Sequence, residues 1–347
     1  MDNTITNTPL KTTTPRFNII MAIVTTLILI LIFAYPATHF FTKDAAIPPS
    51  ILKPEQLKGF SLTQSPVEVG IYIKNFQDFD VTKGEFTIDA TVWFLFDPRT
   101  VSLARIGEFT FERAEINKKS AATTEIRGAH LLAEYEVRVN FQLPLNFSLF
   151  PFDDHRLIFT LINPSFAPYE VIFTSSRNNL LVNPEMSIEG WTFIDKTVET
   201  GYVENRVNPQ ASQEEYTPRA IFALDFKRTG VRHIISIILP LLVIFFVGFF
   251  TFTFDPKTNK KYDVVNMSVT LITALIAYRF VIEALSPQAG YFMFSDYIFL
   301  AFLVAIAAIL VSNIFYEQAT KNTKIIITII LHLLIIGLFF YFIAPWR

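Results

Sequence analysis

The chain carries Ile237-Leu-Pro-Leu-Leu-Val-Ile-Phe-Phe245 at the centre of an apolar segment that runs over about residues 233–254. Three further apolar segments follow it, over about residues 264–285, 292–316 and 324–345. About 20 predominantly apolar residues are enough to cross a bilayer as an α-helix. The sequence therefore predicts a four-helix transmembrane domain over residues 230–347.

The composition agrees with a membrane protein and excludes several other classes. Hydrophobic residues make up 51% of the 347 residues, more than a soluble chain of this length usually carries. The net charge is -2, and no basic run is interleaved with aromatics, so we expect no nucleic-acid partner. Cysteine is absent, which excludes disulfides and thiol catalysis. Since no catalytic triad, metal-binding His spacing or Gly-rich phosphate loop is found, we expect neither an enzyme nor a cofactor or metal site.

An additional apolar helix is predicted near the N-terminus, over residues 17–37. It is either a signal sequence or a signal anchor. Its length of nearly 20 residues and the poor cleavage site at Ala34-Tyr-Pro-Ala37 favour a retained anchor. Because Lys11 and Arg16 precede it, residues 1–16 are expected to form a cytoplasmic tail and the segment that follows to be exported.

Residues 43–229 have the pattern of a β-sandwich. Apolar and polar residues alternate over Gly70–Ile73, Phe86–Trp93 and Tyr135–Phe141, as in antiparallel strands with one buried face. Turn signals separate such stretches at Thr82-Lys-Gly84, Asp97-Pro98 and Asn163-Pro-Ser165. We therefore expect a β-sandwich domain ahead of the four membrane helices.

The loops between the apolar segments predict an orientation. Basic residues lie in the first and third loops: Lys257, Lys260, Lys261, Lys321 and Lys324. The middle loop, Ser286–Asp296, has no Lys or Arg. By the positive-inside rule, the basic loops are cytoplasmic and the β domain lies on the extracytoplasmic side of a cell (inner) membrane.

The segment over residues 264–285 differs from the other three because one of its faces is polar. Asn266, Thr270, Thr273 and Ala277 recur at helical spacing, and Phe280 continues the stripe toward the outer end. Two interpretations are open. Such side chains can bind neighbouring helices by hydrogen bonds, or they can line a water-filled pore. In the second interpretation the acids at the two ends, Asp263 and Glu283, form rings that select cations.

Several stretches resemble the pentameric ligand-gated ion channels (Cys-loop receptors). The residues from Leu143 to Leu157, centred on Phe150-Pro-Phe-Asp153, are similar to the signature loop of the family. The leucines occupy the places of the paired cysteines, as in prokaryotic members that lack the disulfide. Further similar stretches are the proline-containing segment at 237–245, Glu283-Ala-Leu-Ser-Pro287 with the following Tyr291, and Val69–Ile73.

The resemblance implies a subunit of a homopentameric ligand- or proton-gated ion channel that is cation-selective. Its partners would be copies of itself, membrane lipid, monovalent ions and a small-molecule or proton agonist. The family's main gate position falls on the polar Thr273, so the constriction is expected to move outward to Ala277 and Phe280. Arg279 either pairs with Glu283 at i+4 or places positive charge at the pore mouth and weakens cation preference.

The resemblance also implies roles in the β domain. Asp153, Arg228 and Asp80 (or Asp78) are expected to meet and couple the β domain to the pore, although any single such pair is more often a static salt bridge. Candidate ligand-binding aromatics are Trp93, Trp191, Tyr202 and Tyr216, the last two flanking a polar loop. Buried aromatics of a sandwich are more often core residues. The histidines His130 and His155 are candidate proton sensors.

One other function stays open on the sequence. A non-conducting membrane sensor or assembly protein, whose ectodomain binds a ligand or partner, would carry the same architecture. The sequence names neither the agonist nor, because of Arg279, the sign of the permeant ion.

Overall fold

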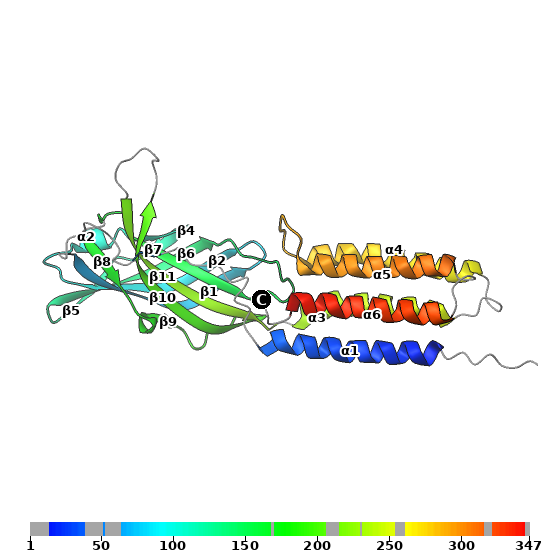
Figure 1. Ribbon diagram of the computed structural model, residues 1–347. Coiled ribbons are helices and arrows are strands. Elements are labelled where there is room, and N and C mark those ends of the chain that lie inside the picture. The colour runs from blue at the N-terminus through cyan, green and yellow to red at the C-terminus, as the bar shows by residue number, and fades with distance from the viewer. Residues whose placement is uncertain are drawn as a thin grey trace, which may run out of the picture. The chain divides into compact units, whose positions relative to one another are not determined.

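The computed structural model describes residues 14–38, 51–52, 64–167, 170–205, 215–229, 231–253, 261–315 and 321–343. The chain forms two compact units (Figure 1). The β unit comprises Phe41–Asn146 and Asp153–Gly230, and the helical unit comprises Met1–Phe40, Phe147–Phe152 and Val231–Arg347. This division differs from the expected domains in that the N-terminal helix and the six residues of Phe147–Phe152 belong with the C-terminal helices.

Strands of the β unit form two sheets. The seven-stranded sheet has the order β4-β6-β2-β1-β8, with β5 paired to β6 and β9 paired to β1. Its strands are β1 (Ser65–Asp80), β2 (Glu85–Phe96), β4 (Ala114–Lys119), β5 (Thr123–Arg127), β6 (His130–Gln142), β8 (Val171–Thr174) and β9 (Leu180–Val182). The four-stranded sheet has the order β10-β11-β7-β3. Its strands are β3 (Thr110–Phe111), β7 (His155–Ile162), β10 (Trp191–Asn205) and β11 (Glu215–Arg228).

The expected alternation is found in the strands. Along β2 every second side chain is buried, as the sequence pattern predicts for a strand with one core face. The three stretches identified from the sequence lie within β1, β2 and β6, and the three turn signals fall in turns between elements. A short helix α2 (Leu103–Ile106) and a 3-10 turn η2 (Arg177–Asn179) complete the described part of the β unit.

Aromatic side chains join the two sheets. Phe76 of β1 packs edge to face on Phe226 of β11 at 5.7 Å between ring centroids. Phe141 of β6 packs in the same way on Phe159 of β7 at 4.7 Å. All four rings are buried, so the core lies between the sheets, an arrangement compatible with a β-sandwich.

The helical unit contains five long helices, all within the part of the chain that the structure describes. They are α1 (Thr14–Thr38), α3 (Val231–Phe250), α4 (Lys261–Leu285), α5 (Phe294–Ile314) and α6 (Lys321–Ile343). A 3-10 turn, η3 (Thr251–Thr253), continues α3. The four C-terminal helices match the four predicted segments to within a few residues.

Four of these helices are long and apolar enough to cross a membrane, over Arg16–Ala34, Asp263–Leu285, Phe294–Ile314 and Asn322–Tyr341. The apolar part of α3, Ile234–Phe250, is shorter. The protein therefore has the features of a membrane protein. Of the lysines that predicted its orientation, Lys257 and Lys260 lie outside the described residues.

Candidate functional site

The polar stripe of α4 faces away from the other helices of its own unit. Asn266, Thr270, Thr273, Ala277 and Phe280 are all exposed, and Phe280 is 70% exposed. The two threonine hydroxyls donate to carbonyl oxygens of α4 itself, that of Thr270 to Asn266 at 2.9 Å and that of Thr273 to the carbonyl four residues earlier at 3.1 Å. These hydroxyl bonds therefore do not join α4 to a neighbouring helix.

One polar contact that joins helices lies on the opposite face of α4. Ser268 is fully buried, and its hydroxyl accepts a hydrogen bond of 2.8 Å from the Asn313 side chain of α5. The same amide nitrogen donates to Thr251 of η3 at 2.8 Å. This buried polar cluster performs the helix-binding role that one interpretation of the sequence gave to the exposed stripe.

At its two ends α4 carries exposed carboxylates. Asp263 lies in the first turn of the helix and is exposed. Near the other end, Arg279 Nε lies 3.2 Å from Glu283 Oε1, as the i+4 spacing predicted. Arg279 Nη1 also donates to Asp296 Oδ1 at 2.5 Å, a partner on α5 that the sequence did not identify. One guanidinium thus faces two carboxylates, and the three groups together carry a charge of -1.

These three charged residues line an open cavity of about 530 Å³ in the helical unit. The loop between α4 and α5 forms the rest of its wall, over residues 286–293. Tyr291 of this loop, part of one stretch that resembles the channel family, accepts a hydrogen bond of 2.8 Å from the Phe147 backbone N–H.

The segment Phe147–Phe152 packs on the N-terminal end of α5. The backbone N–H of Phe294 donates to Ser148 O at 2.8 Å, and that of Ser295 donates to Phe150 O at 3.1 Å. The first N–H groups of a helix have no partner within the helix. Carbonyls of a loop that is distant in sequence therefore complete the hydrogen bonding of this helix end.

Directly after this segment, Asp153 pairs with Arg228 in the β unit. Arg228 donates Nε to Asp153 Oδ1 at 3.0 Å and Nη2 to Oδ2 at 2.9 Å, a bidentate geometry. His155 Nε2 lies 2.7 Å from Asp153 Oδ2, and the Arg228 guanidinium lies 4.4 Å from the Trp191 ring centroid. The sequence predicted the first pair, and it did not identify His155 as a third member.

Asp153 is fully buried, yet its carboxylate is stabilised in the charged form. Burial raises the pKa of Asp153, but the charge of Arg228 and hydrogen bonds from His155 and Arg228 outweigh it and lower the pKa to about 2. The Arg228 backbone N–H also donates to Asp154 Oδ1 at 2.9 Å. Two acids in sequence thus hold both the side chain and the backbone of Arg228.

Asp80, which was expected to meet Arg228, pairs with residues of its own turn. Its carboxylate accepts a hydrogen bond of 2.5 Å from Thr82 Oγ1 and lies 2.9 Å from Lys83 Nζ. The hydrogen bonds from Thr82 and Lys83 lower the pKa of Asp80 to about 2. The reason is local: Asp80 ends β1, and the turn that follows brings Thr82 and Lys83 to it at little entropic cost. The alternative residue Asp78 is exposed on the same strand.

The four candidate ligand-binding aromatics are not gathered in one place. Trp191 pairs with Arg228 at one end of β10, and Tyr202 pairs with Pro218 near the other. At about 3.3 Å per residue, eleven residues of strand place them roughly 36 Å apart. Within one chain they therefore cannot contact the same small ligand. Tyr216 pairs with Glu204, close to Tyr202, and the polar loop between these two tyrosines lies outside the described residues.

Tyr202 is a core residue and has no exposed surface with which to contact a ligand. Its hydroxyl donates to Val171 O at 3.0 Å, and burial raises the pKa of Tyr202 to about 12. Trp93 is half-buried and pairs in register with Gly70, whose missing side chain leaves the space that the indole ring occupies. The structure thus explains these two aromatics by packing.

Trp191 borders a cavity. This cavity has a volume of about 470 Å³. The other wall residues are Val182, Asn183, Pro184, Met186, Ser187, Ile188, Thr192, Phe193 and Phe226. Of the two candidate proton sensors, His155 is buried beside Asp153 and His130 is exposed.

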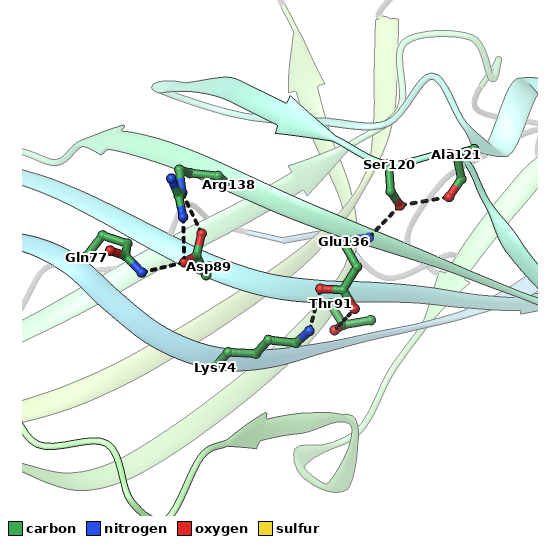
Figure 2. A network of polar contacts seen from close by, with 8 residues as sticks. All are labelled: Lys74, Gln77, Asp89, Thr91, Ser120, Ala121, Glu136 and Arg138. Atoms are coloured by element: carbon green, nitrogen blue, oxygen red, sulfur yellow. Dashed lines mark hydrogen bonds and ion pairs between the residues drawn. The ribbon is translucent and has the colours of Figure 1, made fainter.

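Across β1, β2 and β6, one face of the seven-stranded sheet carries matched charges (Figure 2). Glu136 pairs with Lys74 and accepts a hydrogen bond of 2.9 Å from Thr91. Two residues along β6, Arg138 binds Asp89 through two bonds of 2.7 and 3.0 Å. These polar side chains alternate with the core residues of the same strands. This face of the sheet is therefore suited to contact with solvent rather than to packing under a second hydrophobic layer.

No known protein-family model matches the chain, and a search of curated proteins found no significant match.

Proposed function

We propose that the chain is one subunit of a homopentameric, ligand- or proton-gated, cation-selective ion channel in which α4 lines the pore. The observation that carries this proposal is the exposure of the α4 polar stripe. A stripe that bound neighbouring helices of its own chain would be buried against them. Instead the stripe is exposed on the surface of the helical unit, while Ser268 on the opposite face makes a buried contact between helices.

The other helices support this interpretation by contrast. The exposed positions in the middle of α3, α5 and α6 are apolar, for example Leu239, Val304 and Leu333. Such faces suit lipid tails, which offer no hydrogen bonds. In contrast, α4 exposes Asn266, Thr270 and Thr273 within its apolar span, at positions that a bilayer would leave without water. A water-filled pore supplies the solvent that this face requires.

A single helix encloses no pore, so the proposal requires a closed ring of subunits. The number five, the extracytoplasmic side for the β unit and the inner membrane come from the resemblance and from the basic loops of the sequence. Asp263 would form one acidic ring. At the other end, Arg279 binds both Glu283 and Asp296, so its positive charge is more than neutralised. The remaining charge of -1 supports a preference for cations.

The β unit would act as a β-sandwich sensor. Phe152 belongs to the helical unit and Asp153 to the β unit, so the peptide bond between them links the segment on the α5 end to the Asp153–Arg228 pair. Movement of the segment would therefore act on the Asp153–Arg228 pair through this peptide bond. The agonist belongs to the class of small molecules or protons.

Because the chain has no cysteine, single cysteines provide a direct test. Thr273→Cys places a thiol on the stripe, and Val304→Cys places a control thiol on the exposed, apolar face of α5. Only an ionised thiol in water reacts with a charged, membrane-impermeant thiol reagent. In liposomes we expect Thr273→Cys to react about tenfold faster or more. Equal, slow reaction at both positions would place the stripe in lipid and refute the pore.

Oligomer mass and conductance complete the test. The detergent-solubilised protein should have the mass of five chains of 39.7 kDa each. Liposomes that contain it should pass monovalent cations when the pH or the concentration of small amines is changed. A pentamer that passes no ions under any condition would favour the alternative of a non-conducting sensor, and a complex of another size would reject the channel.

A further inference from the structure

The N-terminal helix α1 buries two polar residues, whereas its exposed side is apolar. Its most buried residues are Asn18, Thr25 and Leu29, which share one helical face. The exposed residues are all apolar over the middle of the helix: Ile19, Ile20, Ile23, Val24, Leu27, Ile30 and Leu31. A helix with this distribution is suited to lipid on one side and to a helical bundle on the other.

At one end, Asn18 completes the hydrogen bonding of α3. Its side-chain amide donates to the Phe249 carbonyl at 2.9 Å, and the contact is buried. Because α3 ends at Phe250, this carbonyl belongs to the last turn, where carbonyls have no partner within the helix. The Thr251 hydroxyl donates a hydrogen bond of 2.6 Å to the neighbouring Gly248 carbonyl.

Near its other end, α1 contributes to a cluster of four aromatic rings. Phe33 stacks on Phe152 at 5.3 Å between centroids and 28° between ring planes. Phe33 also meets Phe339 of α6 edge to face at 5.3 Å. Phe294 of α5 completes the cluster, 5.8 Å from Phe152 and 5.6 Å from Phe339. The segment Phe147–Phe152 is thus held by α1 as well as by α5.

We infer that α1 is kept in the mature protein as a fifth helix of the helical unit, where Phe33 clamps the segment Phe147–Phe152 against α5. Removal of α1 as a signal sequence would leave the Phe249 carbonyl without its partner and uncover one face of Phe152. The apolar outer face and the specific inner contacts both fit a permanent part of the bundle. That the clamp also controls pore opening rests on the proposed function.

The first test is the intact mass of the full-length protein purified from membranes. We expect the mass to include residues 14–38. A mass that lacks α1 would overturn the inference.

The second test measures the clamp by thiol labelling and needs no conductance. Leu149 is buried in the segment, so Leu149→Cys reacts with a maleimide only when the segment opens. Loss of one aromatic stack should raise the labelling rate about threefold to tenfold in Phe33→Ala. Leu31→Ala, at a position 74% exposed on the lipid side, is the control and should leave the rate unchanged. Phe33→Leu keeps apolar volume without a ring, so it separates loss of the aromatic stack from general misfolding.

The outcomes separate this inference from the channel proposal. Equal labelling rates in Phe33→Ala and Leu31→Ala would overturn the clamp, whether or not the liposomes conduct. Faster labelling in Phe33→Ala without conductance in any variant would support the clamp and reject the channel. Faster labelling together with a shifted pH or amine dependence of conductance would support both.

Discussion

Replacing Asp153 by asparagine would remove a buried carboxylate that binds the Arg228 side chain through two hydrogen bonds. The pKa of Asp153 is about 2, against about 3.9 in an unfolded chain. At about 1.4 kcal/mol for each pH unit of this difference, the carboxylate contributes roughly 3 kcal/mol to the stability at neutral pH. Breaking a buried ion pair by removing one partner costs about 3–5 kcal/mol, which agrees. We therefore expect Asp153→Asn to be strongly destabilising.

The pH dependence has a definite sign. The pKa of Asp153 in the folded protein lies below the value for the unfolded chain, so the contribution is fully present above about pH 4. It is lost as the pH falls toward 2, where the folded carboxylate also takes up a proton. The wild-type protein should lose stability over this interval, and Asp153→Asn should lose less because it has no carboxyl group to titrate.

Thermal unfolding of the detergent-solubilised full chain measures both effects. Tryptophan emission is a suitable signal because the Trp191 ring lies 4.4 Å from the Arg228 guanidinium. A loss of 3 kcal/mol in a unit of this size corresponds to a fall in Tm of about 6–12 °C. Asp97→Asn, which breaks an exposed pair with Arg99, is the matched control and should change Tm little. If Asp153→Asn lowered Tm no more than this control, the reasoning from burial and charge would be wrong.

Three further predictions concern other parts of the chain. Gly70→Ala should destabilise the β unit by about 1–3 kcal/mol in chemical unfolding, because its Cβ would overlap the Trp93 ring; an unchanged stability would mean that the indole can move aside. Tyr202→Phe should cost about 1–2 kcal/mol in the same assay through loss of the buried hydrogen bond to Val171, and no cost would show that another group takes over this carbonyl. Asp263→Ala should lower the cation-to-anion permeability ratio, and an unchanged reversal potential in ion-gradient recordings would remove this acid from the selectivity ring.

The elements of the fold could be predicted because their signals are local. Alternation along β2 and the apolar runs of α4, α5 and α6 depend on which face of each element is buried, and the sequence shows this directly. The stripe on α4 could be placed on one face for the same reason. Whether that face was buried depended on the neighbouring helices, and a helical period alone could not decide it.

The pairs Asp153–Arg228 and Arg279–Glu283 were predicted, whereas other partners of the site residues depend on strand register, turn geometry or helix packing. Trp191 and Tyr202 were grouped by residue type, and only the strand pairing shows that they lie at different ends of β10. Asp80 was expected to meet Arg228, and the structure shows its pair with Lys83 of its own turn. Asp296 became a partner of Arg279 only through the packing of α4 on α5.

The assignment of Phe147–Phe152 to the helical unit has a consequence for how the chain is made. The segment leaves the ribosome well before the helices that receive it, since Phe147 and its partner Tyr291 are 144 residues apart. Until α5 is inserted, the segment lacks the helix end on which it packs. If the β unit were excised as a soluble fragment with this segment retained, the apolar side chains of the segment would face water and favour aggregation. The order of synthesis thus ties the packing of this segment to insertion of the last helices.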